Sequence, residues 1–232
     1  MNRHATGRDA TIIVPVLNEG QIIGKFLAHL RDVVSDEEII VVDGGSGDDT
    51  APIAARHAPV IVSAPGRARQ MNSGAAVARG NILWFLHADS TLPDRPIEQI
   101  KEALKDPAVV GGCFRLRLPA RGLAYRICDD LGNIAVDIFK LACGDHGIFV
   151  RRGVFEAVGG YPDVPLIEDL GLCRRMRRAG RFVQLRSYVV SQPRRWFRNG
   201  PYRTTGMYLL MLSLYFCGAP MPVLTRLYKR LK

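Results

Sequence analysis

The chain has 232 residues, of which 47% are hydrophobic and 23% are charged, a balance that excludes wholesale disorder and fits one globular domain with or without a small appendage. The formal net charge of +10 favours polyanionic partners such as nucleic acid, anionic lipid or small phosphorylated ligands. Five cysteines without a CxxC pair, and a first ten residues without an apolar core, argue against a zinc knuckle, a redox dithiol and a signal peptide, and they predict a cytoplasmic protein.

The first half of the chain alternates β-branched apolar runs with helical patterns. Strands are predicted over residues 11–16, 38–42, 60–62 and 82–86, and helices over 22–30 and 69–79, the first with Asn18 as its N-cap. This alternation predicts an α/β fold with βαβ units, in which ligands bind beyond the carboxyl ends of parallel strands. Pro15, Asp43 and Asp89 lie at these ends, so we expect them to face one ligand crevice.

The second half is less regular. A strand over 109–118, interrupted by two glycines, precedes a helix over 121–141 with one apolar face: Leu123, Ile127, Leu131, Ile134, Ile138 and Leu141. A strand at 147–150, a basic helix at 170–179, an extended segment at 182–190 and helices from about residue 203 complete the pattern. Because no internal repeat or low-complexity linker occurs, residues 1–232 are predicted to form a single domain.

The turn after the second strand, Gly44-Gly45-Ser46-Gly47, resembles a dinucleotide-binding loop only in part. The GxGxxG pattern fails because residue 50 is threonine, and no Walker sequence occurs, which argues against hydride transfer and P-loop chemistry. Asp43, just before this turn, has two interpretations. Its carboxylate accepts hydrogen bonds either from a ribose or base edge, or from the backbone amides of its own turn.

Asp89 follows the fourth strand in the sequence Phe-Leu-His-Ala-Asp-Ser. A carboxylate there suits a divalent cation that holds a diphosphate, because hard cations such as Mg²⁺ need only one or two protein carboxylates besides water and phosphate. His87 would be an unusual ligand for magnesium, whereas manganese tolerates nitrogen better. The alternative is that Asp89 and Ser90 only cap the next segment.

Two further stretches hold groups suited to catalysis or binding. Glu168 and Asp169 start a predicted helix, where they either cap it and favour its dipole or supply a general base for an attacking hydroxyl. The run Gln192-Pro193-Arg194-Arg195-Trp196 is either a basic surface segment with a half-buried tryptophan, or a site where Trp stacks on a sugar or base and Arg neutralises phosphate.

Taken together and in this order, the motifs resemble those of family 2 glycosyltransferases. The matching stretches are 14–19, 42–50 (similar to VDDGSxDxT), 67–72, 85–89 (the DxD strand end), 144–147, 168–170 (the ED motif) and 192–196 (QxxRW). The resemblance covers residues 11 to about 200 and is nearest to a compact bacterial, non-processive type. It implies a single-domain GT-A fold, a Rossmann-like nucleotide-diphospho-sugar transferase with a mixed sheet flanked by helices and further helices at the C-terminus.

The same resemblance implies a role for each matching residue. The nucleotide-sugar pocket would use Pro15, Glu19, Asp43, Arg69 and His87; the acceptor and diphosphate side would use Asp145, His146, Gln192, Arg195 and Trp196. Asp89 would bind Mg²⁺ or Mn²⁺, and Asp169, beside Glu168, would be the base of an inverting transfer from a UDP- or GDP-linked sugar to a hydroxyl acceptor. Residues 11–105 would form the nucleotide-binding half, 106–200 the acceptor and catalytic half, and 201–232 a helical appendage.

Three departures from the family pattern bear on these roles. Gly44 replaces the second Asp of VDD, which removes one nucleoside contact, and His87 replaces the first Asp of DxD, so that metal binding depends more on Asp89. The QxxRW motif usually belongs to polymerising synthases with many membrane spans. The longest apolar stretch here, 207–224, contains Gly218 and two prolines and is too short for a span, so processive polymer export is not expected.

Two other functions stay open. A sugar nucleotidyltransferase would need a Gly-rich, Arg-containing loop after the first strand, where this chain has Pro-Val-Leu-Asn-Glu. A non-catalytic basic protein would bind nucleotides or membranes; no nucleic-acid module is evident, and nucleic acid is not an expected partner. The C-terminal segment, with Tyr208, Leu209, Leu212, Tyr215 and Phe216 on one face between basic residues, either packs on the core or lies on the anionic inner surface of the plasma membrane.

Overall fold

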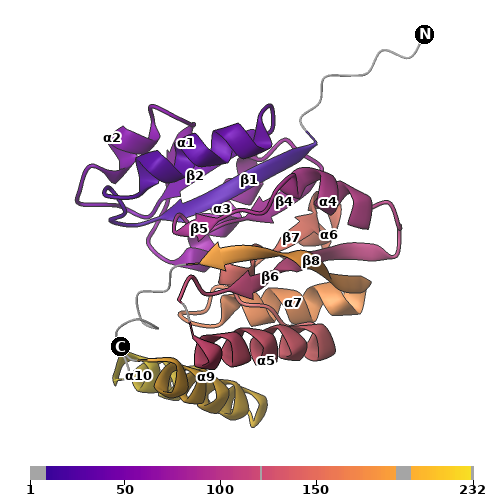
Figure 1. Ribbon diagram of the computed structural model, residues 1–232. Coiled ribbons are helices and arrows are strands. Elements are labelled where there is room, and N and C mark those ends of the chain that lie inside the picture. The colour runs from indigo at the N-terminus through magenta and orange to yellow at the C-terminus, as the bar shows by residue number, and fades with distance from the viewer. Residues whose placement is uncertain (1–8, 121, 192–199, 231–232) are drawn as a thin grey trace.

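The computed structural model of the protein describes residues 9–120, 122–191 and 200–230 (Figure 1). Eight strands form one mixed sheet in the order β3-β2-β1-β4-β7-β6-β8-β5. Helices cover both faces of this sheet (Figure 1). Most strands are therefore continuous apolar runs and do not alternate apolar with polar residues. The mixed α/β sheet flanked by helices is the architecture that the sequence predicts.

The first half of the chain forms the parallel part of the sheet. Strands β1 (Ala10–Val16), β2 (Glu38–Asp43), β3 (Val60–Val62) and β4 (Ile82–Phe85) pair in parallel and alternate with helices α1 (Ile23–Val34), α2 (Thr50–Ala54) and α3 (Arg67–Val77). Ile12 belongs to the apolar core on one face of the sheet and Ile13 to the core on the other. The predicted βαβ units are therefore confirmed.

The second half adds antiparallel pairs to the same sheet. It contains β5 (Ser90–Thr91), α4 (Pro96–Ala103), β6 (Val109–Arg117), β7 (Phe149–Arg151), α6 (Arg152–Ala157), α7 (Glu168–Ala179) and β8 (Arg181–Ser191). Strand β7 lies antiparallel between β4 and β6. A Cβ atom on Gly111 would lie 2.4 Å from the Phe149 carbonyl oxygen, and one on Gly112 would lie 2.1 Å from that of Val183. The two glycines thus allow the neighbouring strands to approach β6, and they do not interrupt it.

Three helices lie together at the end of the molecule remote from β1–β3 (Figure 1). They are α5 (Leu123–Phe139), α9 (Pro201–Phe216) and α10 (Met221–Arg230). Met207, Met211 and Leu224 form a small buried cluster between α9 and α10, against which Leu166 and Ile167 also pack. Among the described helices, none is both long enough and apolar enough to span a bilayer.

One local prediction is wrong, and four short elements were not predicted. Asn18 does not cap α1, whose N-cap is Ile22; instead Asn18 has φ 55°, its N–H donates to Ser46 Oγ at 2.9 Å and its Oδ1 accepts the Gly47 N–H at 2.9 Å. It therefore joins the loops after β1 and β2. The short elements β5, α4, α6 and the 3₁₀ turn η1 (Gly144–His146) were not predicted, because they are too short to show a periodic pattern.

Candidate active site

The carboxyl ends of β1, β2 and β4 lie at one edge of the sheet, since these strands are parallel. Asp43 ends β2, Glu19 follows β1, and His87 and Asp89 follow β4. Glu19 is close enough to Asp89 for its charge to raise the pKa of Asp89. Pro15 lies within β1, half-buried and paired with Val42. The strand-end positions are therefore gathered as the sequence predicts.

Asp43 is buried and occupied by its own turn. Its Oδ2 accepts the N–H groups of Gly45 and Ser46 at 3.2 and 3.0 Å, and its Oδ1 accepts the Ser46 hydroxyl at 2.5 Å. These contacts match the turn interpretation of this residue. Gln70 of α3 supports the same edge, because its amide donates to the carbonyl oxygens of Val16 and Val42.

Residues of the turn η1 contact both the segment after β4 and the first turn of α7. His87 Nδ1 lies 2.8 Å from Asp145 Oδ1, and the Gly144 N–H donates to Asp169 Oδ2 at 2.8 Å. A Cβ atom on Gly144 would lie 2.7 Å from His87 Nε2 and 3.2 Å from Asp169 Oδ2. Only a glycine lets the turn approach both side chains, so residue 144 brings the DxD-like strand end and the acidic pair together.

Glu168 and Asp169 occupy the first turn of α7, and both are buried. The residue before them, Ile167, has φ 56° and ψ 29°, a left-handed conformation that is rare for a β-branched side chain. Asp169 Oδ1 is buried without a hydrogen-bond partner among the described residues. One oxygen of this carboxylate is therefore fixed by Gly144, and the hydrogen-bonding capacity of the other is unused in the described part of the chain.

Burial and the neighbouring charge of Glu168 raise the pKa of Asp169 to about 7, against the opposing effects of His87, Arg67 and the Gly144 N–H. Burial works to lower the pKa of Arg67, but the charges of Asp145, Asp169 and Glu168 outweigh it and raise that pKa. The Arg67 guanidinium thus lies within the field of the acidic cluster. A carboxylate with a pKa near neutrality is suited to accept a proton at physiological pH.

Asp145 and His146 have opposite responses to the same environment. Burial works to raise the pKa of Asp145, but the hydrogen bond and charge of His87, together with Arg67 and His146, hold it well below its usual range. Burial lowers the pKa of His146 despite the nearby charge of Asp145. The site therefore combines a firmly ionised Asp145 with a His146 that favours its neutral form.

Asp89 has the features of a cation ligand. Its Oδ1 is buried without a hydrogen-bond partner in the described part of the chain, and burial together with the charge of Asp145 raises its pKa. A divalent cation would supply the missing partner and favour the ionised form. Within residues 9–120, 122–191 and 200–230, no three His, Cys, Asp or Glu side chains form a closed metal site. The single unpartnered oxygen of Asp89 fits a cation that takes its other ligands from water or phosphate.

The structure brings seven of the predicted residues into one cluster, leaves Pro15 and Asp43 at the neighbouring strand ends, and places Arg69 apart. Glu19, His87, Asp89, Asp145, His146, Glu168 and Asp169 belong to one electrostatic cluster. Arg69 lies apart, in a bidentate pair with Asp163 in which both side chains are more than half exposed. Gln192, Arg195 and Trp196 lie outside the described residues. Two contributors, Arg67 and Gly144, were not predicted, although both fall within matched motifs.

Arg67 and Arg69 differ only in the face of α3 that they occupy. Positions two apart on a helix point about 200° away from each other, so one arginine of an Arg-x-Arg pair faces the site when the other does not. Gln70 and Met71 are buried, and the 100° repeat places the centre of these two residues about 10° from Arg67 and about 150° from Arg69, so the inward side of α3 is that of Arg67. The helical phase of residues 67–77 could therefore have predicted which arginine faces the site. The role of the Gly144 N–H, in contrast, has no signal in the sequence.

Residues 11–158 match the model of the family described as "Glycosyl transferase family 2". The chain is 26% identical over 197 residues to an O-antigen chain rhamnosyltransferase of Salmonella anatum, covering 73% of this chain and 61% of that protein. It is 32% identical over 166 residues to a PGL/p-HBAD biosynthesis glycosyltransferase of Mycobacterium bovis, covering 65% of this chain and 62% of that protein. The chain thus spans under two thirds of the length of these relatives.

Two solved structures share the fold. A mannosyltransferase of Pyrobaculum calidifontis, in complex with GDP-Man and Mn²⁺, superposes with a TM-score of 0.62 at 21% identity, covering 98% of this chain and 70% of that one. Glucosyl-3-phosphoglycerate synthase of Mycobacterium tuberculosis, in complex with Mn²⁺, UDP and its product, gives a TM-score of 0.64 at 19% identity, covering 92% and 81%. At these identities the likeness shows the architecture alone.

Proposed function

Because this chain belongs to glycosyl transferase family 2, we propose that it transfers a sugar from a nucleotide-diphosphate sugar to a hydroxyl acceptor, with inversion at the anomeric carbon. The observation that carries this proposal is Asp169. It is buried, one oxygen is held by Gly144, the other has no partner among the described residues, and its pKa is raised to about 7. These are the properties of a general base that works near neutral pH.

Asp169 would accept the proton of the acceptor hydroxyl as its oxygen attacks the anomeric carbon. The bond between that carbon and the diphosphate breaks on the opposite side, so a single in-line attack inverts the anomeric centre. Glu168 would keep Asp169 basic through like-charge repulsion. Ile167 and the Gly144 N–H would hold the carboxylate in place, because a base must lie within hydrogen-bond reach of the proton that it removes.

The donor would lie across the ends of β1, β2 and β4. Pro15, Glu19 and Asp43 would line the nucleoside pocket, His87 would lie beside the diphosphate, and Arg69 would reach the donor only by leaving Asp163. Asp89 would bind Mg²⁺ or Mn²⁺, and such a cation stabilises the negative charge that develops on a leaving diphosphate. The unpartnered Asp89 oxygen supports this assignment, as does the presence of Mn²⁺ in the two structures of similar fold.

The acceptor side would be formed by Asp145 and His146 together with Gln192, Arg195 and Trp196. In this division, residues 11–105 bind the nucleotide, 106–200 bind the acceptor and provide the base, and 201–232 form a helical appendage of the same domain. The donor would be UDP- or GDP-linked, since the mannosyltransferase of similar fold was solved with GDP-Man and the phosphoglycerate enzyme with UDP.

The proposal includes a location. The enzyme would work in the cytoplasm, with the C-terminal segment against the inner surface of the plasma membrane. The distribution of charge supports this: all 22 acidic residues lie at or before Asp169. The chain after that residue is basic and apolar, which is the composition of segments that bind anionic membrane surfaces.

A donor screen tests the proposal. UDP- and GDP-sugars, with and without Mn²⁺, are added to the protein, and its thermal midpoint is measured. A ligand that binds only the folded state at 100 times its dissociation constant adds about 2.7 kcal/mol of stability. The donor found in this way is then incubated with candidate hydroxyl acceptors, and the anomeric configuration of the product is read by NMR. Retention of configuration, or release of pyrophosphate from a nucleoside triphosphate, would contradict the proposal.

A further inference from the structure

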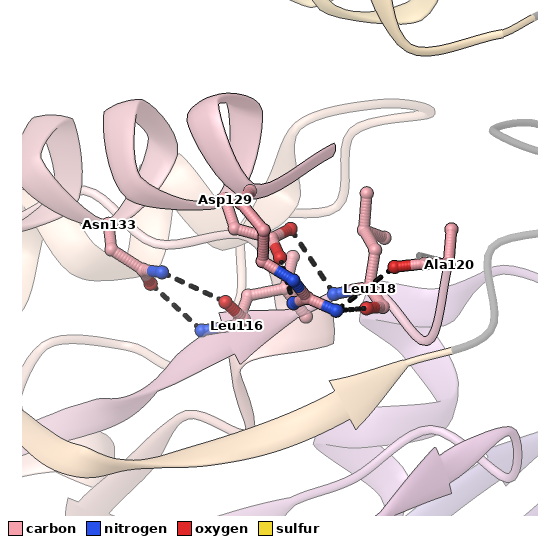
Figure 2. Close-up of polar contacts among 6 residues, drawn as sticks. Leu116, Leu118, Ala120, Asp129 and Asn133 are labelled. Atoms are coloured by element: carbon pink, nitrogen blue, oxygen red, sulfur yellow. Dashed lines mark hydrogen bonds and ion pairs between the residues drawn. The ribbon is translucent and has the colours of Figure 1, made fainter. Parts of the chain in front are cut away.

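Helix α5 turns its polar side toward the protein (Figure 2). Asn133 exchanges two hydrogen bonds of 2.8 Å with the backbone of Leu116, and Asp129 Oδ1 accepts the Leu118 N–H at 3.2 Å. Asp129 also pairs with Arg126 at 2.8 Å. Within α5 only Asp129, Asn133 and Val136 are buried, so polar contacts with the end of β6 hold most of this helix in place.

The outer side of α5 is apolar. The predicted stripe of Leu123, Ile127, Leu131, Ile134 and Ile138 is 49% to 77% exposed. A helix on the surface of a protein in water normally turns such a stripe toward the core and its polar side toward solvent. The orientation of α5 is the reverse, which indicates that its outer side meets something other than water.

Helix α9 continues this apolar surface. Leu209 and Phe216 are 58% and 61% exposed, and Tyr202 is also exposed. The face expected from the sequence is only partly right, because Tyr208 and Tyr215 pack against the cluster between α9 and α10. Fourteen large hydrophobic side chains are exposed in the described part of the chain, and all but Leu17, Val62 and Val77 belong to α5, α9 and α10. The exposed apolar surface is therefore concentrated at one end of the molecule.

The stripes of the two helices border the same contact. Thr205 Oγ1 lies 3.3 Å from Cys128 Sγ, which joins α9 to α5. The helical repeat of 100° per residue places Cys128 beside the α5 stripe, and it places Thr205 beside Tyr202, Leu209 and Phe216. We call the five stripe residues of α5 and these three residues of α9 the docking face. The acidic Asp130 and Asp137 lie on the side of α5 that is remote from α9.

The charge of the chain indicates what the docking face binds. No acidic residue occurs after Asp169, whereas fourteen arginines and lysines do, and no charged residue occurs between Arg203 and Arg226. Arg203, near the start of α9, and Arg226, in the middle of α10, are both exposed. The part of the docking face on α9 is therefore apolar, uncharged and flanked on both sides in the sequence by cations, which matches the interface of an anionic bilayer, where acyl chains lie beneath acidic head groups.

We propose that the docking face binds the surface of an anionic lipid bilayer. A second copy of the chain is a weaker match, because a two-fold dimer would place this basic segment against itself. This proposal goes beyond the proposed function because it makes α5, and not the C-terminal helices alone, the main site of membrane contact. It holds whether or not Asp169 is the catalytic base.

The docking face is also connected to the candidate active site. The cluster between α9 and α10 packs against Leu166 and Ile167, which directly precede the acidic pair. Tyr228 of α10 is close enough to Arg67 to affect its pKa. Helices α9 and α10 therefore link the docking face to the start of α7, where the acidic pair lies.

Binding to vesicles tests the proposal. The double variant Leu131→Glu/Ile134→Glu changes two exposed positions of α5, and Val62→Glu/Val77→Glu changes two equally exposed apolar positions on the remote half. Vesicles of phosphatidylcholine with about 30% phosphatidylglycerol should bind the unmodified protein more tightly than phosphatidylcholine alone, and less tightly as salt rises. The α5 variant should lose at least about tenfold in affinity, while the control pair retains it.

Two measurements make the test independent of variant folding. Hydrogen exchange of the unmodified protein, with and without vesicles, should show protection confined to α5, α9 and α10. Light scattering should show the same mass for the protein and its α5 variant. Unchanged vesicle affinity of a folded α5 variant, or protection elsewhere, would refute the proposal. A dimer that the α5 variant breaks would instead identify the face as a subunit interface. Loss of sugar transfer with vesicle binding intact would count only against the proposed function.

Discussion

Two buried carboxylates, one at the end of β2 and one at the start of α7, have opposite surroundings. Both oxygens of Asp43 accept hydrogen bonds from its own turn. Asp169 has one oxygen bonded to Gly144 and one without a partner, beside a second acid. A buried acid whose hydrogen bonds are complete stabilises the local fold, whereas one whose hydrogen bonds are incomplete is unstable as an anion and hence reactive toward protons.

The largest effect is expected for Asp169→Asn. The amide keeps the shape of the side chain and can still accept the Gly144 N–H, but it cannot take up a proton. Turnover should fall by about 10²–10⁴-fold, the usual contribution of a general base, while the donor dissociation constant stays the same. Steady-state kinetics and calorimetry measure the two quantities. Asp94→Asn, at an exposed carboxylate before α4, is the control, and an Asp169→Asn enzyme of normal turnover would remove this residue from the mechanism.

The same substitution should stabilise the fold at high pH. The pKa of Asp169 is raised in the folded protein to about 7, so the folded state binds the proton more tightly than the unfolded state does. Stability from this group is present below its unfolded pKa near 4 and is lost as pH rises toward 7. Asp169→Asn should therefore unfold like the original protein at pH 4 and be more stable above pH 7, by roughly 4 kcal/mol at most.

Urea unfolding of both proteins across this pH range measures the difference. A gap that grows with pH would confirm that the buried anion is costly to the fold. If the two curves stay parallel from pH 4 to pH 8, Asp169 is not strained by its surroundings. Asp169, like Asp43, would then be a buried carboxylate whose ionisation does not destabilise the fold.

Asp89 lies between these two cases, because its unpartnered oxygen needs a cation rather than a proton. Asp89→Ala should weaken UDP or GDP binding in the presence of Mn²⁺ by at least about tenfold, and leave binding in the presence of a chelator unchanged. Calorimetric titration of nucleotide with and without Mn²⁺ gives both values. Equal dependence on Mn²⁺ in the variant and the original protein would exclude Asp89 as the ligand. Asp94→Ala, an aspartate in the loop before α4, is the control.

Asp43→Ala should have the opposite effect on stability from Asp169→Asn. It removes the acceptor for two backbone N–H groups and one hydroxyl, so the free energy of unfolding should fall by about 1–3 kcal/mol. Asp43→Asn keeps one acceptor oxygen and should lose less. Denaturant unfolding near neutral pH measures both. A variant as stable as the original protein would show that the turn does not depend on this carboxylate, and would favour a role in donor binding alone.

The parallel half of the fold could be predicted because its strands are apolar on both faces, as in Ile12 and Ile13, and alternate with helices at regular spacing. The site could be predicted only as a set of strand ends and motifs. The approach of Gly144 to Asp169 depends on how η1 packs, and this leaves no periodic signal. The stripe of α5 was recognised but not its outward orientation, because periodicity shows that residues share a face and does not show what the face meets.

The smallest effect on stability is expected at Arg69, and its comparison with Arg67 tests which face of α3 lies toward the acidic pair. Arg69 and Asp163 form an exposed ion pair, so Arg69→Ala should change the free energy of unfolding by less than about 1 kcal/mol. Arg67 lowers the pKa of Asp169, so Arg67→Ala should move the acid limb of the pH–rate profile to higher pH, whereas Arg69→Ala should leave it in place. The position of the limb is informative even if Arg67→Ala is slow, because it reports the protonation of the base and not the rate at its maximum. A limb that moves only in Arg69→Ala would mean that α3 presents its other face to the acidic pair, and a limb that moves in neither variant would mean that neither arginine acts on the base.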